Sequence, residues 1–250
     1  MVTQGLAADI EAARRLIGAG MVLIDTTVCD KAGQLVAIDS PMALKTAQRR
    51  FVSRGGEKLD GGLSAAGIDP SDWVCADIGS SSGGFTDCLL QRGARTVYSV
   101  DVGYGLLDWK LRQDGRVKVL ERTNARHLTS EQIADPLDLA VIDASFISLK
   151  PLLVPLLPLF RDLVRIFALV KPQFQLPREA VGPGGIVRDP ALHRQALGMV
   201  QQFGESLGLH CATMVASPIR GVKGNQEFFM LLTGRAGSVP ESRKIEEEGE

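Results

Sequence analysis

Three charged residues stand at the ends of apolar, strand-like runs in the second half of the chain. Asp143 and Lys171 each follow such a run directly, and Glu227 opens another. Ligands of open α/β sheets bind at the carboxyl ends of the strands, and burial disfavours the charged form of a lysine, as a general base requires. Taken singly, each residue also fits an ordinary surface charge or a lysine that reaches solvent. Their convergence on one sheet edge predicts an active site.

A loop rich in glycine and serine follows another apolar run, 74–78, and leads into a helix-like stretch. Asp77 lies near the end of the run, and the loop reads Gly79-Ser80-Ser81-Ser82-Gly83-Gly84. Glycines allow a sharp turn and a close approach of the backbone to a ligand. The spacing matches neither the dinucleotide fingerprint nor the phosphate-binding loop. A cofactor without a phosphate group, such as S-adenosylmethionine, is therefore expected here, although a plain turn is the alternative.

The next strand-like run, 96–101, ends in an acid, Asp101. In doubly wound folds an acid at this place hydrogen-bonds a ribose diol. The alternative is a carboxylate that only caps the following helix. Together with the glycine loop, Asp101 favours an adenosyl cofactor over NAD.

The elements that must position these residues alternate between strand and helix. The strand-like runs are 74–78, 96–101, 117–120, 137–142, 165–170, 210–216 and 227–232, and the main helix-like stretches are 83–93, 106–113, 148–160 and 190–207. Alternating strands and helices with nearly continuous apolar strands predict an α/β fold with a doubly wound, mostly parallel, seven-stranded Rossmann-like sheet. No helix separates the last two runs, so an antiparallel pair is expected at the end.

The chain outside this domain divides into three further parts. Residues 1–46 predict a small α+β domain, with a helix over 7–19 and strands at 22–24, 35–38 and 42–44. A basic, glycine-bearing linker, 47–58, follows. The main domain then extends over 59–235, and an acidic tail, 236–250, is expected to be disordered.

Composition excludes several other kinds of protein. With 45% hydrophobic and 23% charged residues the chain is of globular type, and no apolar run reaches the roughly 18 residues of a membrane helix. The four cysteines form no C-x-x-C pair and the three histidines are scattered, so neither a metal site nor a disulfide framework is expected. A net charge of −1 leaves nucleic acid open as a partner. A start without leader-like features predicts a cytoplasmic protein with no membrane partner.

Several motifs, in this order, resemble those of the TlyA (haemolysin A) family, and together they cover nearly the whole chain to about residue 233. They are Phe51-Val52-Ser53-Arg54-Gly55-Gly56-Glu57-Lys58-Leu59, Asp77-Ile78-Gly79-Ser80-Ser81-Ser82-Gly83-Gly84-Phe85, Asp101-Val102-Gly103-Tyr104-Gly105, Arg122-Thr123-Asn124-Ala125-Arg126, Val170-Lys171-Pro172-Gln173-Phe174 and Gly224-Asn225-Gln226-Glu227-Phe228. Members of that family are ribosomal-RNA 2′-O-methyltransferases with an FtsJ-like catalytic domain. The resemblance implies S-adenosylmethionine as cofactor and ribosomal RNA, within ribosomal subunits, as substrate, with cytidine as the expected nucleoside.

The resemblance also implies roles for individual residues. The catalytic tetrad falls on Lys58, Asp143, Lys171 and Glu227, with Lys171 taking the proton from the ribose 2′-hydroxyl. The expected cofactor-binding residues are Asp77, Gly79, Ser81, Gly83, Gly84, Phe85, Asp101 and Asn124. The expected RNA contacts are Arg14, Arg15, Arg49, Arg50 and Arg54, for which solvated surface arginines are the alternative.

The N-terminal domain resembles the family's small RNA-binding domain but is expected to lack its first half-helix, because the chain begins inside that helix. Two other functions are carried as alternatives. A haemolysin-type, membrane-active protein needs an amphipathic or spanning segment, and the apolar run 151–160 is broken by prolines. A non-catalytic ribosome-binding factor is the second alternative. The sequence does not indicate the oligomeric state or which subunit's RNA is modified.

Overall fold

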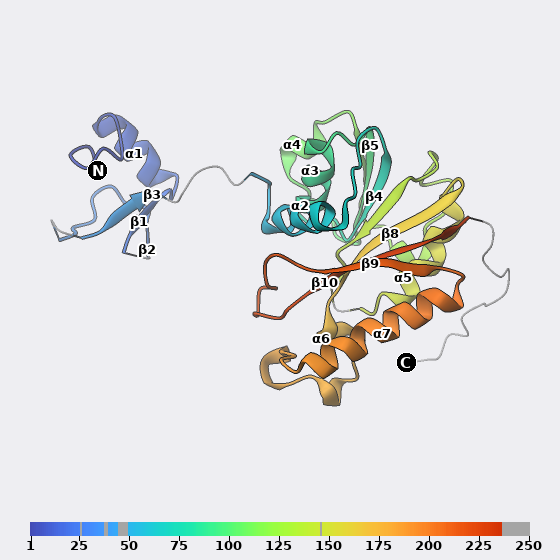
Figure 1. Cartoon of the computed structure of the whole chain (residues 1–250). Helices are drawn as coiled ribbons and strands as arrows, with labels where there is room; N and C mark the ends of the chain where they lie inside the picture. Colours follow the sequence, from blue (N-terminus) through green and yellow to red (C-terminus); the bar gives the residue numbers. More distant parts are fainter. Residues whose placement is uncertain (26, 38–39, 45–49, 146, 237–250) are drawn as a thin grey trace. The chain divides into compact units, whose positions relative to one another are not determined.

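The computed structural model describes residues 1–25, 27–37, 40–44, 50–145 and 147–236 (Figure 1). The chain divides into two compact units, Met1–Arg49 and Arg50–Glu250. Each unit is described by itself. The predicted tail, 236–250, lies outside the described residues except for Ala236. In the described part of the chain, no helix is long and apolar enough to cross a membrane.

The first unit packs one helix with a small antiparallel sheet. Its elements are α1 (Ile10–Gly18), β1 (Val22–Ile24), β2 (Thr27–Cys29) and β3 (Met42–Leu44), and the strand order is β2-β1-β3. The predicted helix over 7–19 is shorter than expected because Asp9, in extended conformation, caps it: the Asp9 carboxylate accepts a hydrogen bond from the Ala12 N–H at 2.6 Å.

One strand of this small sheet differs from the prediction. The described part of the run 35–38 forms no strand, and Leu35 is almost fully exposed. The partner of β1 on that side is β2 instead, with Ile24 paired to Thr27. A tight hairpin turn makes this possible, since Asp25 adopts a φ of +56°, which aspartate tolerates better than most residues.

The second unit is built on a seven-stranded sheet in the order β6-β5-β4-β7-β8-β10-β9. Its strands are β4 (Val74–Ile78), β5 (Thr96–Val100), β6 (Val117–Leu120), β7 (Leu139–Ile142), β8 (Leu163–Val170), β9 (His210–Ala216) and β10 (Phe228–Arg235). The first five are parallel, and β10 runs antiparallel to both β8 and β9. The predicted doubly wound, mostly parallel sheet with an antiparallel end is confirmed.

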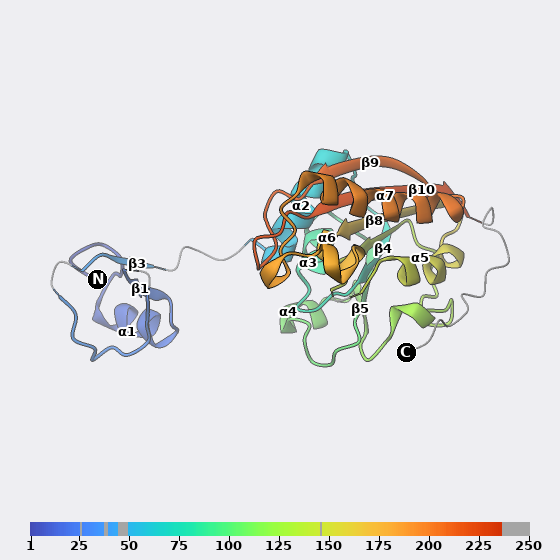
Figure 2. The same ribbon diagram turned by 90° about the horizontal axis from the view of Figure 1, so that it is seen from below.

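Helices cover both faces of this sheet, as Figure 1 shows, and α6 and α7 lie in front of the strands in the view of Figure 2. The helices are α2 (Arg54–Ala66), α3 (Gly84–Gln91), α4 (Trp109–Arg112), α5 (Lys150–Leu156), α6 (Pro172–Gln175) and α7 (Pro190–Ser206). Two large hydrophobic clusters form, one with α5 and α7 and the other with α2 and α3, and a third, smaller one contains Leu176, Val187 and Ala196. Neighbouring residues of β4 divide between them: Ala76 packs in the first cluster and Cys75 in the second.

Helix α2 was not predicted from the sequence, and it begins inside the segment expected to be a linker, 47–58. The Ser53 hydroxyl caps it by accepting from the Gly55 N–H at 3.3 Å. Four glycines weaken its helical propensity. Packing explains three of them, because an added Cβ would lie 2.3 Å from Phe51 at Gly56, 2.7 Å from Pro218 at Gly61 and 2.6 Å from Phe229 at Gly62.

Candidate active site

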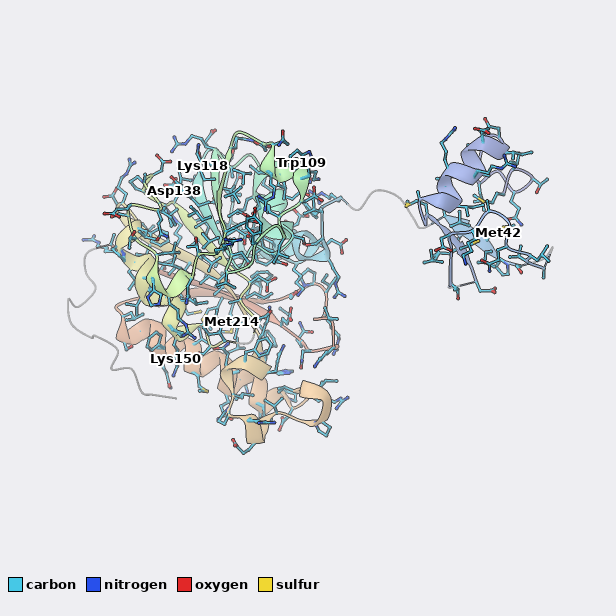
Figure 3. All side chains as sticks on the ribbon, turned by 180° about the vertical axis from the view of Figure 1, so that it is seen from behind. Met42, Trp109, Lys118, Asp138, Lys150 and Met214 are labelled. Atoms are coloured by element: carbon cyan, nitrogen blue, oxygen red, sulfur yellow. The ribbon has the colours of Figure 1, made fainter. Side chains whose placement is uncertain are left out.

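The carboxyl ends of the parallel strands carry most of the predicted site residues. The chain runs from β4 outward to β5 and β6, then returns to place β7 on the other side of β4. This reversal is the kind of position at which doubly wound sheets bind ligands. Asp138, labelled in Figure 3, lies at the opposite end of β7, where its carboxylate accepts from the Val74 N–H at 2.9 Å.

Lys171 and Asp143 follow the adjacent strands β8 and β7 and form an ion pair. The Lys171 Nζ lies 2.6 Å from the Asp143 Oδ1, and the lysine side chain is 8% exposed. The same Nζ donates a hydrogen bond to the Ser145 Oγ at 2.7 Å. The amine is therefore oriented by two groups from the segment after β7.

Lys58 and Glu227 form a second, more deeply buried pair. The Lys58 Nζ donates to the Glu227 Oε2 at 2.6 Å, and the two side chains are 10% and 4% exposed. Lys58 comes from the first turns of α2, and Glu227 precedes β10. Because β10 is antiparallel to β8, its start lies at the same edge as the ends of β7 and β8.

A cavity of about 220 Å³ brings residues of both pairs together, since Lys58, Asp143 and Ser145 all line it. Asp77 and Ser81 line it as well. The Lys58 ammonium and the carboxylates of Asp77 and Asp143 therefore face one space beside the glycine loop. Lys171 and Glu227 do not line this space but are paired with Asp143 and Lys58, which do. Such an arrangement can position a hydroxyl group and accept its proton.

An adjoining cavity of about 320 Å³ is lined by residues that the sequence predicts to bind an adenosyl cofactor. Asp101 and Asn124 line it together with apolar side chains such as Val100, Leu106 and Ile147. Gly79, Ser81, Asp143 and Ser145 line this cavity and the previous one, so the two spaces are adjacent. The Asp101 carboxylate accepts hydrogen bonds from the Ser81 N–H at 2.8 Å and from the Gly103 N–H at 2.7 Å. These two bonds fix the orientation of the carboxylate, whose oxygens can accept further hydrogen bonds.

Asp77 is fully buried in the middle of the site. Its Oδ2 accepts from the Thr86 N–H at 2.8 Å and from the Thr86 hydroxyl at 2.7 Å. Its Oδ1 has no hydrogen-bond partner among the described residues. Burial is the main cause that raises the pKa of this carboxyl to about 7, and the Asp143 charge adds to the shift against the opposing Thr86 hydrogen bonds. An unpartnered carboxylate oxygen suits a ligand that carries an amino group.

The predicted glycines lie in the loop after β4 and at the start of α3, and packing leaves no room for a side chain at two of them. At Gly83 an added Cβ would lie 2.3 Å from Leu111, and at Gly84 it would lie 2.2 Å from the Ser53 Oγ. Gly79 has a φ of +81°, and a Cβ there would lie 2.9 Å from the Asp143 carbonyl oxygen. Phe85 is buried against Phe229, with ring centroids 6.0 Å apart, while it also lines the smaller cavity.

The predicted RNA-contacting arginines lie in different parts of the chain. Arg14 and Arg15 are exposed on α1 of the first unit, and Arg49 lies outside the described residues. Arg50 and Arg54 are exposed in the second unit. There Arg50 pairs with Asp60 at 2.6 Å, and Arg54 donates to the Arg220 carbonyl at 2.5 Å.

Sequence reasoning missed two residues of the site. Ser145 contacts the Lys171 amine, and its position two residues after Asp143, at a strand's carboxyl end, was the available signal. Ser53 caps α2 and contacts the Gly55 N–H. In the described part of the chain, no group of three or more His, Cys, Asp or Glu could hold a metal ion.

Comparison with known proteins places this geometry in a family. Residues 51–233 match the model of the FtsJ-like methyltransferases. The TlyA 16S/23S rRNA (cytidine-2′-O)-methyltransferase of Mycobacterium tuberculosis is 43% identical over 248 residues, which are 99% of this chain and 92% of that protein. YqxC of Bacillus subtilis, named as a candidate rRNA methyltransferase, is 44% identical over 249 residues, 99% of this chain and 88% of that protein.

A solved structure from Streptococcus thermophilus, named as a candidate hemolysin, superposes with a TM-score of 0.74 at 37% identity. The superposition covers 98% of this chain and 90% of that one. The matched family model, the full-length relatives and the strand order agree with one another. The chain belongs to the FtsJ-like methyltransferase family.

Proposed function

We propose that the protein transfers a methyl group from S-adenosylmethionine to the ribose 2′-oxygen of a cytidine in ribosomal RNA, within assembled ribosomal subunits. The observation that carries the proposal is the presence of two lysine–carboxylate pairs, Lys171–Asp143 and Lys58–Glu227, at one sheet edge beside a cavity. The name of the TlyA relative supplies the nucleoside and the RNA. A ribosomal substrate places this activity in the cytoplasm.

Lys171 accepts the proton of the 2′-hydroxyl in this scheme. The lysine is 6% exposed, and its amine lies at the carboxyl end of β8 between Asp143 and Ser145, in a position to take a proton from a bound hydroxyl. Asp143, 2.6 Å away, then stabilises the ammonium that forms. Ser145 accepts a hydrogen bond from the same nitrogen. This bond fixes the orientation of the amine toward the reacting hydroxyl.

Lys58 positions the reacting hydroxyl. Its ammonium is held by Glu227, but an ammonium has three donors, so further N–H groups remain for the ribose oxygen. Donation to that oxygen stabilises the negative charge that develops as the proton leaves. Glu227 thus acts as a positioning residue for Lys58.

The residues around the glycine loop fit S-adenosylmethionine. The unpartnered Asp77 Oδ1 matches an α-amino group, Asp101 can accept from ribose hydroxyls, and Asn124 lies in the same cavity as the apolar side chains suited to adenine. Gly79 and Ser81 line both cavities. When bound, this cofactor supplies an electrophilic methyl group carried on a sulfonium. Alignment of acceptor and donor then provides most of the catalysis, since methyl transfer needs an in-line approach and an activated oxygen.

Exposed arginines support binding to an RNA backbone. Arg14 and Arg15 in the first unit and Arg50 and Arg54 in the second can contact phosphates, which position RNA without reading its sequence. Arg49 completes the proposed set. The first unit has the element order expected of the small RNA-binding domain from α1 onward.

The test is transfer of labelled methyl from S-adenosylmethionine to separated, unmethylated ribosomal subunits. We expect label in the RNA of at least one subunit with the wild-type protein and none with Lys171→Ala. Absence of label from both subunits, with a protein that binds the cofactor, would contradict the proposal and favour a non-catalytic ribosome-binding factor.

A further inference from the structure

A third cavity, of about 490 Å³, lies next to the catalytic lysine and has no role in the scheme above. It is lined by Ile147, Ser148, Gln173, Phe174, Leu176, Arg178, Val181, Gly182 and Gly185. Two of its walls continue directly from the catalytic segments. Ser148 follows Asp143 and Ser145 after β7, and Gln173 and Phe174 follow Lys171 after β8.

Phe174 connects this cavity, which we call the side cavity, with the reacting groups. Its ring centroid lies 6.0 Å from the Lys171 Nζ, and the same residue lines the side cavity. The side cavity therefore shares a wall residue with the surroundings of the general base. On a nucleoside, the 2′-oxygen and the base are attached to adjacent ribose carbons. A nucleotide whose 2′-oxygen is at Lys171 thus requires a space of this kind for its base.

Two side-chain amides fix the walls of the side cavity. The Gln175 Oε1 accepts from the Ser148 hydroxyl at 3.1 Å and from the Leu149 N–H at 3.2 Å. Asn225, which is 3% exposed, accepts from the Val187 N–H at 2.9 Å and donates to the Gly185 carbonyl at 2.8 Å. Because Asn225 stands two residues before Glu227, the far wall of the cavity is tied to the catalytic edge.

A third amide, that of Gln173, differs from these two. Its Oε1 is buried and has no hydrogen-bond partner among the described residues, although the residue lines the side cavity. A buried carbonyl oxygen without a donor costs free energy. The amides of Gln175 and Asn225 form hydrogen bonds within the protein, whereas the Gln173 oxygen can accept one from a ligand.

We propose that the side cavity receives the cytosine base of the target nucleotide and that Gln173 reads its Watson–Crick edge. This inference rests on the proposed function. The Gln173 Oε1 would accept from the 4-amino group of cytosine, and the Nε2 would donate to N3. Uracil presents a carbonyl and an N–H at these two positions, so the amide would have to turn over and bury its NH₂ group. Phe174 lines the same cavity, and aromatic side chains commonly contact unstacked bases in RNA recognition.

The position of Arg178 supports a nucleotide as the occupant, since Arg178 is an exposed arginine among the residues that line the side cavity. A guanidinium there can contact a phosphate or the carbonyl at position 2 of the base. A nucleotide that leaves its stack to reach the site recovers part of the lost stacking energy through such contacts.

The test compares cytidine with uridine at the methylated position. Wild-type protein first methylates unmethylated subunits, and the modified nucleotide is located by mass spectrometry of RNA fragments. Subunits with uridine at that position are then prepared, and kcat/KM for both substrates is measured for wild type, Gln173→Met, Gln173→Glu and Gln202→Met. Gln202 is an exposed glutamine of α7 and serves as the matched control. Cofactor affinity, measured by calorimetry, reports that each variant is folded.

Wild type and Gln202→Met are expected to prefer cytidine by about 10- to 100-fold, as for a bidentate amide–base pair. Gln173→Met is expected to lose most of that preference through a slower reaction with cytidine, at unchanged cofactor affinity. Gln173→Glu keeps the acceptor oxygen, differs from glutamine by one atom, and is expected to fall between the two. If both Gln173 variants keep the wild-type preference, the inference is wrong while the proposed function stands. If wild type methylates neither subunit, the proposed function fails and the inference with it.

Discussion

The Lys58 Nζ and the Glu227 Oε2 lie 2.6 Å apart, although the two residues are 169 positions apart in the chain. The pair joins the first helix of the catalytic unit to the start of its last strand. With side chains 10% and 4% exposed, both charges depend on each other, because water solvates neither. The ion pair therefore serves the fold and the site together.

Removing one member of this pair is expected to destabilise the unit. Glu227→Ala leaves a buried ammonium without its partner, and the expected loss of unfolding free energy is about 3–5 kcal/mol. Urea denaturation measures it. Glu57→Ala, which removes an exposed acid from the same helix, is the control and should change stability by less than about 0.5 kcal/mol. Equal midpoints for the two variants would show that the pair is not buried as described.

The double variant Lys58→Met/Glu227→Leu is expected to be more stable than Glu227→Ala, because apolar residues of similar volume often replace a buried ion pair without loss. It is also expected to be inactive. A double variant that is less stable than Glu227→Ala would contradict this view of the pair.

Lys171→Met is expected to lower methyl transfer by about 10²- to 10⁴-fold, the range for removal of a general base. Cofactor affinity is expected to stay unchanged, because Lys171 lines neither of the two cavities proposed to hold the cofactor. Single-turnover kinetics and calorimetry measure the two quantities. Lys118→Met, which replaces an exposed lysine of β6 labelled in Figure 3, should leave both unchanged. Loss of cofactor binding in Lys171→Met would contradict a purely catalytic role.

Asp77 is expected to make stability depend on pH. Burial raises the pKa of its carboxyl from 3.8 to about 7 in the folded state, so folding favours the protonated form. As pH rises, the unfolded chain loses this proton near pH 4 and the folded protein holds it to about pH 7. The contribution of Asp77 to the unfolding free energy therefore falls between about pH 4 and pH 7 and is constant above.

Asp77→Asn removes this dependence. The variant is expected to be more stable than wild type at pH 8, by up to about 4 kcal/mol, and equal to it near pH 4. Thermal or urea unfolding across this range measures the difference, with the exposed Asp162→Asn as control. A difference independent of pH would show that Asp77 is ionised in the folded protein throughout.

Two glycine-to-alanine variants are expected to change stability in opposite directions. At Gly84 an added methyl group would lie 2.2 Å from the Ser53 Oγ and 2.9 Å from the Gly56 backbone nitrogen, so α2 and α3 would have to separate. We expect a loss of about 1–3 kcal/mol and weaker cofactor binding. At Gly198, inside α7, nothing lies within 4 Å, and alanine is expected to stabilise by about 0.5–1 kcal/mol. Denaturant unfolding of both variants measures the two changes in stability. An unchanged stability of Gly84→Ala would contradict the described packing.

The strongly periodic parts of the fold could be predicted from the sequence. β4 (Val74–Ile78) and β9 (His210–Ala216) lie where expected, because an apolar run bounded by polar or glycine residues has few alternative structures. The antiparallel end of the sheet followed from the missing helix between the last two runs. These features depend on local pattern alone.

Helix α2 could not be predicted, because its glycines read as a linker and their purpose is tertiary. Positions 56 and 62 have no room for a side chain, because Phe51 lies beside Gly56 and Phe229 lies beside Gly62. Phe229 is far from this helix in the sequence. For the same reason the glycine loop predicted a cofactor contact at Gly84 but did not reveal that Ser53 is its close neighbour. Distances between segments far apart in the chain are absent from any local pattern.

The most direct test of the central claim is the chemical position of the methyl group. RNA from subunits treated with wild-type protein and labelled S-adenosylmethionine is digested to nucleosides and separated by chromatography with mass spectrometry. The account predicts label in 2′-O-methylcytidine with wild type and none with Lys171→Met. Label in a base-methylated nucleoside, or label in the ribose that persists with Lys171→Met, would contradict it.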